Sequence, residues 1–133
     1  MKLNVVVIDD SALQLVLASK LIQRNEHLNL VGAYADPFLG LNAVNTEKVD
    51  VVLLDVEMPE IDGFSLQKLF KNSVHVIVNS TRANFELQAY VNGAIDFIQK
   101  PLNTTKIEKA VARIIEFQKL TTVEGTFMNT IAS

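Results

Sequence analysis

Five short apolar runs recur along the chain, and segments with a helical spacing of apolar residues separate them. The runs cover residues 3–8, 28–34, 49–54, 74–79 and 94–98. Each run is too short for a typical helix and too continuously apolar for a strand with one exposed face. The pattern therefore predicts five strands that are covered on both faces.

The segments between the runs carry signals for helix starts. Ser11 and Gln14 fit a capping box, in which a serine caps the helix and a residue three positions later completes the pair. Asp36 followed by Pro37 is typical of a cap and a first helical residue. Strands and helices thus alternate five times, which predicts an α/β fold with a parallel sheet and helices on both faces.

The last helix has the clearest pattern. Thr105 and Glu108 form a second capping box, and apolar residues then recur at helical spacing. This periodicity ends near Thr121. We therefore predict one domain over residues 1–121, followed by a C-terminal tail or the start of a linker over residues 122–133.

Composition and charge fit a single globular domain. The chain has 133 residues, of which 49% are hydrophobic and 20% charged, so it can bury one core. Its net charge of -3 gives no electrostatic reason to bind nucleic acid directly. The lack of cysteine excludes disulfides and thiolate metal sites. The apolar run at residues 5–8 is too short for a signal peptide or a membrane span, so we expect a cytoplasmic protein without membrane attachment.

Polar residues follow four of the predicted strands. They are Asp9-Asp10, Asp55, Ser80-Thr81 and Gln99-Lys100-Pro101. The carboxyl ends of parallel strands meet at one edge of the sheet, and ligands bind there where the strand order reverses. Three carboxylates at one edge repel one another, so they need a cation or a raised pKa. All-oxygen donors favour a hard divalent ion such as Mg2+.

Each of these residues also has a purely structural explanation when it is taken alone. Asp10 could cap the following helix, Asp9 could be a solvated loop acid, and Asp55 could cap a loop. Lys100 could be a surface lysine and Ser80 an ordinary turn residue. Their joint occurrence at the ends of successive strands favours a functional site. In that site Lys100 would add a positive charge and Ser80 a hydroxyl donor.

These residues, together with the segment LLDVEMPEIDG, carry a resemblance to a known family. The chain resembles a response-regulator receiver domain of two-component signalling, in the CheY-like superfamily, over residues 1 to about 120. The resemblance implies a flavodoxin-like (βα)5 doubly wound fold with a five-stranded parallel sheet of order 2-1-3-4-5. Residues 80–102 are most similar to the receivers of LytTR-type regulators.

The resemblance implies a metal-dependent phosphorylation site. Asp55 resembles the phospho-accepting aspartate of the family. Asp10, Asp55 and the backbone carbonyl of Glu57 resemble the ligands of Mg2+ or Mn2+, and Asp9 would reach the ion through water. Lys100 resembles the lysine that pairs with the phosphoryl group.

The resemblance also implies a switch and a set of partners. Ser80 and Phe97 match the hydroxyl and aromatic switch positions, with Phe97 in place of the commoner tyrosine. A sensor histidine kinase or a phosphotransfer protein would donate the phosphoryl group. An output protein or domain would bind the face made by the fourth helix, the fifth strand and the fifth helix, and phosphorylation could bring two copies together as a homodimer. Such a domain is not an enzyme, apart from catalysing its own phosphorylation and dephosphorylation.

Two other interpretations stay open at the level of the sequence. The segment DVE at residues 55–57 is faintly similar to haloacid-dehalogenase-like phosphatases, whose aspartyl nucleophile has an acidic partner two residues later. That fold, however, places its nucleophile on the first strand and needs a longer chain. The other interpretation is an unphosphorylated interaction module with a receiver fold, although the intact set of acids argues against it.

Overall fold

The computed structural model describes the backbone of residues 2–132 and the side chains of residues 2–121. Its strands are β1 (Leu3–Ile8), β2 (Leu28–Tyr34), β3 (Val51–Leu54), β4 (His75–Ser80) and β5 (Asp96–Gln99). Its helices are α1 (Ala12–Gln23), α2 (Pro37–Thr46), α3 (Gly63–Gln67), the short 3-10 turn η1 (Ala83–Phe85), α4 (Glu86–Val91) and α5 (Thr104–Ala132). Strands and helices therefore alternate in the order that the sequence predicted.

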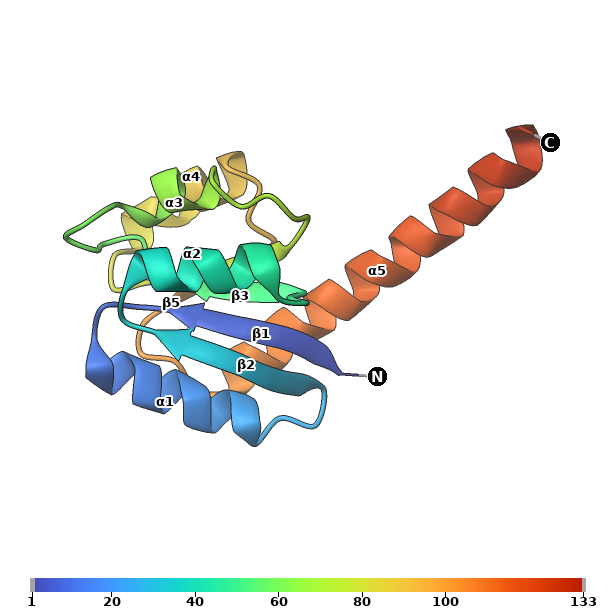
Figure 1. Ribbon diagram of the computed structural model, residues 1–133. Coiled ribbons are helices and arrows are strands. Elements are labelled where there is room, and N and C mark those ends of the chain that lie inside the picture. Colours follow the sequence, from blue (N-terminus) through green and yellow to red (C-terminus); the bar gives the residue numbers. More distant parts are fainter. Residues whose placement is uncertain (1, 133) are drawn as a thin grey trace.

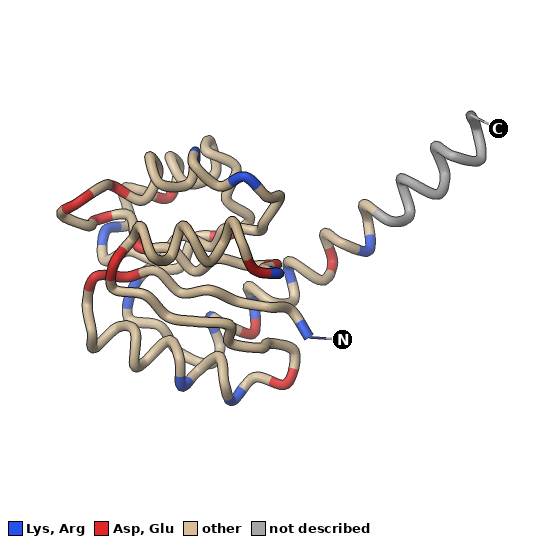
Figure 2. Tube along the Cα trace, viewed as in Figure 1, with Lys and Arg blue, Asp and Glu red and all other residues tan. Residues whose placement is uncertain are grey.

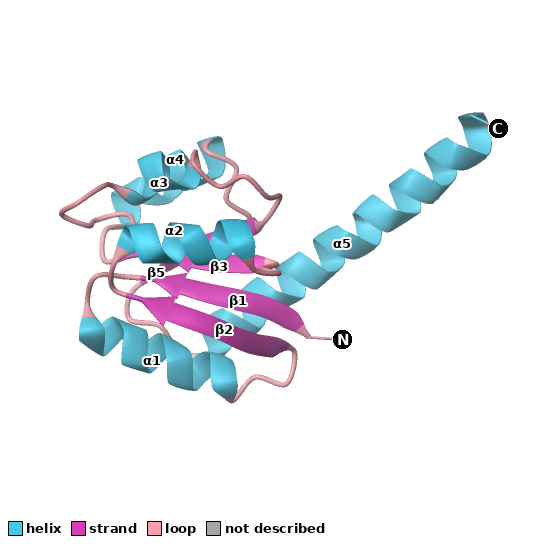
Figure 3. Cartoon of the chain, in the orientation of Figure 1, coloured by secondary structure: helices cyan, strands magenta, loops and turns pink. Residues whose placement is uncertain are grey.

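All five strands lie parallel in one sheet with the order β2-β1-β3-β4-β5. Helices α1 and α5 cover one face of the sheet, and α2, α3 and α4 cover the other (Figures 1 and 3). The strand order reverses between β1 and β3, which is where doubly wound sheets form their binding crevice. The predicted flavodoxin-like α/β fold and its strand order are confirmed.

The strands are buried on both faces because alternate residues point to opposite sides of the sheet. Val6 and Ile8 of β1 pack with residues of α2, α3 and α4. Val5 and Val7 pack with residues of α1 and α5. The central strand β3 is buried at all four positions, so the residue that follows it starts from a rigid support.

The predicted capping residues of α1 and α2 are confirmed, but only half of the first capping box forms. The Ser11 hydroxyl oxygen accepts a hydrogen bond from the Gln14 N–H at 3.3 Å. The Ser11 N–H donates to Asp9 Oδ1 at 3.0 Å, where a full capping box would use the Gln14 side chain. The start of α1 therefore holds the Asp9 carboxylate in place. At the start of α2, Asp36 caps the helix by accepting from the Phe38 N–H at 2.9 Å.

The fifth helix differs from its prediction at both ends. Asn103 accepts the capping bond from the Lys106 N–H at 2.8 Å, so the prediction of Thr105 as the cap is wrong. The helix continues to Ala132, although the sequence predicted a tail or linker over residues 122–133. A helix is compatible with a linker, and the domain boundary stays a prediction. None of the described helices, α5 included, is long and apolar enough to cross a membrane.

Candidate functional site

The carboxyl edge of the sheet brings together the acids that the sequence predicted. Ile8 of β1 pairs with Leu54 of β3, so the residues that follow, Asp9 and Asp55, leave the sheet side by side. The Asp55 N–H donates to the Ile8 carbonyl oxygen at 2.9 Å. Oxygens from the carboxylates of Asp9, Asp10 and Asp55 lie within 4.8 Å of one another. Figure 2 shows acidic residues gathered in the loops at this end of the sheet.

Two of these acids are buried, and burial raises the pKa of one of them, Asp55. Asp9 and Asp55 are 3% and 5% exposed, whereas Asp10 is exposed. The pKa of the Asp55 carboxyl is raised from 3.8 to about 7, first by burial and then by the negative charge of Asp9, while Lys100 lowers it in part. The site thus holds more negative charge than the protein alone compensates.

Lys100 supplies positive charge from the end of β5. Its ammonium nitrogen lies 2.8 Å from Asp9 Oδ2 and 3.8 Å from Asp55 Oδ1, and its side chain is 10% exposed. The Lys100 N–H donates to the Ser80 carbonyl oxygen at 2.8 Å, which anchors the lysine backbone to the end of β4. One ammonium group therefore forms ion pairs with two buried carboxylates, and it lies closer to Asp9 than to Asp55.

The donor set of the acidic cluster fits a hard divalent cation. Asp9, Asp10 and Asp55 all offer carboxylate oxygens, which are the side-chain ligands that Mg2+ and Mn2+ prefer. A dication would also balance the excess negative charge that one lysine leaves. Because Asp10 is exposed, one side of the cluster is open to solvent. Mg2+ commonly keeps several water ligands, so this openness suits it.

The loop after Asp55 folds tightly against the site because Gly63 has no side chain. A Cβ at Gly63 would lie 2.7 Å from the Val56 Cα and closer still to the Asp55 carbonyl oxygen. The Gly63 N–H instead donates to the Val56 carbonyl oxygen at 3.0 Å. The loop between Val56 and Gly63 therefore closes at the edge of the sheet. Asp62, the residue before Gly63, caps α3 by accepting from the Ser65 N–H at 2.9 Å.

Glu57 lies beside the acidic cluster and contacts three of its neighbours. Its N–H donates to Asp55 Oδ1 at 3.2 Å. Its side chain accepts a hydrogen bond from the Ser80 hydroxyl at 3.4 Å and pairs with the Arg82 guanidinium at 3.4 Å. The structure thus places Glu57 beside Asp55, while the role of its backbone carbonyl as a metal ligand stays a prediction.

The two predicted switch residues lie on β4 and β5, which follow β3 in the sheet. Ser80 ends β4 and is fully buried. Phe97 of β5 pairs in register with Val78 of β4, and its half-buried ring packs on the sheet face that α2, α3 and α4 cover. The structure therefore brings Ser80 into contact with the site through Glu57. It places Phe97 on the neighbouring strand, on the side of α4.

Sequence reasoning missed the Glu57 side chain and Arg82. Each stands two residues after a predicted site residue, since Glu57 follows Asp55 and Arg82 follows Ser80. The strands β3 and β4 are adjacent and parallel, so Glu57, three residues after β3, and Arg82, two residues after β4, leave the same edge of the sheet side by side. Opposite charges at those two positions were therefore a readable signal for an ion pair.

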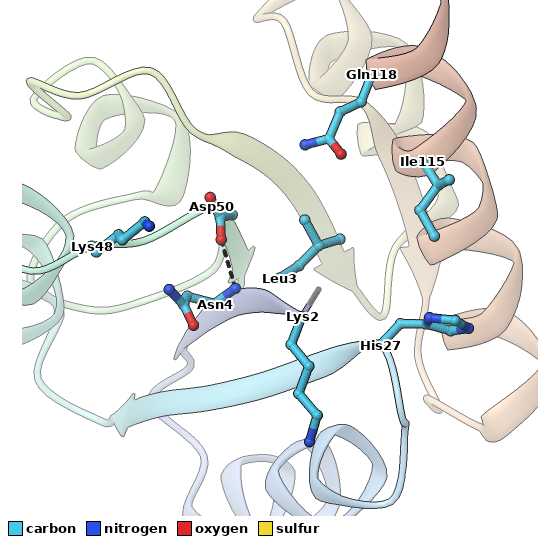
Figure 4. A pocket seen from close by; sticks show the side chains of 8 residues that line it. All are labelled: Lys2, Leu3, Asn4, His27, Lys48, Asp50, Ile115 and Gln118. Atoms are coloured by element: carbon cyan, nitrogen blue, oxygen red, sulfur yellow. Dashed lines mark hydrogen bonds between the residues drawn. The ribbon is translucent and has the colours of Figure 1, made fainter.

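A pocket of about 430 Å³ lies at the opposite end of the sheet, near the start of β1 and the middle of α5 (Figure 4). The Asp50 carboxylate in it already accepts the Asn4 N–H at 2.8 Å. Figure 4 shows the Lys2 and His27 side chains pointing away from Asp50. Lys2 and His27 therefore do not converge with Asp50 on one point, and we place the chemistry at the acidic edge.

A doubly wound sheet of order 2-1-3-4-5, with buried aspartates at the carboxyl ends of β1 and β3 and a lysine after β5, defines the CheY-like class of signalling domains. The comparison with protein families agrees. Residues 5–112 match the model of the response regulator receiver domain, and the chain belongs to this family.

Curated relatives and solved structures place the chain among these receivers. It is 40% identical over 107 residues to protein-glutamate methylesterase/protein-glutamine glutaminase 2 of Shewanella sp. (strain MR-7), covering 76% of this chain and 30% of that protein. The response regulator domain of Thermotoga maritima CheB is 29% identical with a TM-score of 0.71, covering 90% of this chain and 96% of that chain. CheY in the CheX-CheY-BeF3-Mg+2 complex of Borrelia burgdorferi is 25% identical with a TM-score of 0.76, covering 85% and 89%.

These findings select among the interpretations that the sequence left open. The chain is a receiver domain of two-component systems, and such domains are generally non-catalytic signalling domains. A haloacid-dehalogenase-like phosphatase is not favoured, because Asp55 follows the third strand and not the first. The chain spans 30% of the length of the methylesterase from Shewanella sp. (strain MR-7).

Proposed function

We propose that the chain accepts a phosphoryl group on Asp55 in a Mg2+-dependent reaction and changes conformation as a result. The observation that carries the proposal is the placement of Asp55. Its carboxylate is buried, stands within 4.8 Å of two further carboxylates, and lies 3.8 Å from the Lys100 ammonium group. This is a nucleophile in a site that lacks positive charge, which suits a cation and a transferring phosphoryl group.

In the proposed reaction a carboxylate oxygen of Asp55 forms a bond to phosphorus, and the bond from phosphorus to the donor breaks. The donor leaves with the electron pair of that bond, and the product on Asp55 is an acyl phosphate. Lys100 would shift from Asp9 toward the new phosphoryl oxygens, because it already lies between both carboxylates. Bound Mg2+, held by Asp10, Asp55 and the Glu57 carbonyl, would neutralise charge on the transferring oxygens.

The raised pKa of Asp55 gives metal binding a further consequence. With a pKa of about 7, Asp55 is partly protonated at neutral pH when no metal is bound. A carboxylate must be deprotonated to ligate a metal or to attack phosphorus. Mg2+ binding would therefore release a proton, and the site becomes ready to react as the ion binds. Mn2+ would serve in the same way, since it prefers the same oxygen donors.

The signal would leave through the face of α4, β5 and α5. New phosphoryl oxygens on Asp55 offer acceptors to the Ser80 hydroxyl, and a movement of Ser80 would free space for Phe97 to turn inward. The phosphoryl donor would be a sensor histidine kinase or a phosphotransfer protein. The downstream partner would be an output protein, a further domain or a second copy of the chain. The cytoplasmic location expected from the sequence stays a prediction.

Phosphorylation by a small donor tests the proposed function. Acetyl phosphate with Mg2+ should add one phosphoryl group to the protein, measured by intact mass, and chelation of the metal should abolish the reaction. Asp55→Asn should remove the labelling. Asp50→Asn is a matched control, because Asp50 is a partly buried aspartate at the other end of the sheet. Labelling of Asp55→Asn at the wild-type level would contradict the proposal.

A further inference from the structure

The Glu57 side chain is held between the ends of two neighbouring strands, directly at the mouth of the site. One of its carboxylate oxygens accepts from the Ser80 hydroxyl at 3.4 Å, and the other lies 3.4 Å from the Arg82 guanidinium. The Glu57 side chain is 38% exposed and that of Arg82 is 62% exposed. Glu57 therefore joins a buried hydroxyl to a cation at the surface.

This arrangement commits the Ser80 hydroxyl to a single direction. A serine hydroxyl has one proton to donate, and here the proton is directed to Glu57. The hydroxyl oxygen also accepts a hydrogen bond from the backbone N–H of Arg82 at 3.1 Å. As long as the hydrogen bond to Glu57 persists, Ser80 has no second proton to offer to a phosphoryl group on Asp55.

The two groups that Glu57 binds are the groups that a phosphoryl group on Asp55 would need. A phosphoryl group offers acceptor oxygens and negative charge, which suit a hydroxyl donor and a guanidinium. Glu57 is close enough to compete for them, because its own N–H contacts Asp55 Oδ1 at 3.2 Å. Its carboxylate also adds negative charge at the entrance that an anionic phosphodonor must use.

We propose that the Glu57 side chain is an internal anion that holds Ser80 and Arg82 in the unphosphorylated state and releases them when Asp55 is phosphorylated. The inference rests on the proposed function of Asp55 and adds a positioning residue to it. In this arrangement the carboxylate of Glu57 opposes phosphorylation in two ways. It repels the donor, and it keeps two stabilising partners away from the product.

The test compares labelling rates with acetyl phosphate and Mg2+ in the wild type and in Glu57→Gln. The substitution removes the charge and keeps the backbone carbonyl and an acceptor for Ser80. The rate should rise about two- to fivefold, the upper part of the range that the loss of a partly exposed charge pair gives. Glu60→Gln removes the same charge from an exposed position in the same loop, and its effect should stay under about twofold.

Arg82→Gln should slow labelling, because it leaves the Glu57 charge unpaired and removes a partner of the product. The gain of Glu57→Gln should be larger with acetyl phosphate, a dianion at neutral pH, than with phosphoramidate, which carries less negative charge. A purely structural role of Glu57 would not produce this dependence on the donor. Glu57→Asn, a second neutral variant, repeats the measurement in case Glu57→Gln folds poorly.

The outcomes separate this inference from the proposed function. Labelling of the wild type at Asp55 with an unchanged or lower rate in both neutral Glu57 variants would overturn the role of Glu57 alone. Equal gains in Glu57→Gln and Glu60→Gln would also overturn it, since the effect would then be general charge repulsion. A wild-type protein that takes no label would instead overturn the function proposed for Asp55.

Discussion

Two buried aspartates at the edges of the same sheet have opposite surroundings. Asp96, the first residue of β5, is 8% exposed, and Asp55, directly after β3, is 5% exposed. The Asp96 carboxylate accepts from the Arg113 guanidinium at 3.0 Å, from the Tyr90 hydroxyl at 3.2 Å and from the Phe97 N–H at 2.8 Å. Donors from α4, β5 and α5 thus converge on its Oδ1 from within the protein.

The Asp55 carboxylate has no such set of partners. It accepts one backbone hydrogen bond from Glu57 at 3.2 Å, stands beside Asp9, and lies 3.8 Å from an ammonium group that is closer to Asp9. Its pKa is raised to about 7 by burial and by Asp9. The comparison teaches that burial alone does not mark a reactive acid. A buried carboxylate whose negative charge is not compensated by nearby donors or cations is the one that favours binding of a cation or reaction with a phosphoryl group.

The largest expected effect is the dependence of metal-free stability on pH. The folded protein binds the Asp55 proton more tightly than the unfolded chain does, so this stabilisation is fully present below pH 4 and is lost as pH rises through about 7. The two pKa values, 3.8 and about 7, set an upper bound of roughly 4 kcal/mol on the loss. Urea unfolding in the presence of a chelator at pH 5 and pH 8 measures the larger part of it, up to about 2.7 kcal/mol.

Asp55→Asn is the control for that measurement, because an amide does not titrate. The variant should lose less stability than the wild type between the two pH values, and at pH 8 it should be the more stable protein. An Asp55→Asn variant with the same pH dependence as the wild type would show that the Asp55 carboxyl is not held in an uncompensated state.

Mg2+ should give the next largest effect. At pH 8, Mg2+ at a hundredfold excess over its dissociation constant should raise the free energy of unfolding by about 2.7 kcal/mol, because the unfolded chain has no preformed site. Asp55→Asn and Asp10→Asn should both weaken this stabilisation, while Asp96→Ala should retain it. If the acidic-site variants responded to Mg2+ as the wild type does, the ion would bind elsewhere.

The smallest effect is expected at Asp96, whose carboxylate accepts three hydrogen bonds from the protein. Asp96→Ala should lower the free energy of unfolding by about 1 kcal/mol, because it removes three hydrogen bonds but its partner Arg113 is largely solvated. Tyr90→Phe should cost less, since it removes one hydroxyl and leaves the ion pair. Urea unfolding at constant pH checks both. A gain of stability in Asp96→Ala would show that the Asp96 carboxylate is as poorly compensated as Asp55.

The fold and the position of the acidic edge could be predicted from the sequence because both follow from local patterns. The apolar runs that end in Asp9 and Asp55 read as doubly covered strands, and strands of this kind lie in a parallel sheet with their carboxyl ends together. The structure confirms the parallel sheet and places Ile8 of β1 opposite Leu54 of β3. The family resemblance supplied the strand order.

The contacts that depend on two distant segments could not be predicted in the same way. The network of Asp96 joins Tyr90 of α4 to Arg113 of α5, and the spacing of these three residues in the sequence gives no sign of it. The cap of α5 was also misplaced, because both Asn103 and Thr105 are good capping residues and only the course of the loop decides between them.

The site of the acyl phosphate tests the central claim most directly. After reaction with acetyl phosphate and Mg2+, reduction with borohydride converts a phosphorylated aspartate into homoserine. Mass spectrometry of the tryptic peptides locates it, and the peptide spanning residues 49–68 contains Asp55. We predict homoserine at position 55, with Asp9, Asp10 and Asp96 unchanged. Homoserine at any of those other aspartates, or its absence at position 55 in a labelled protein, would contradict the account.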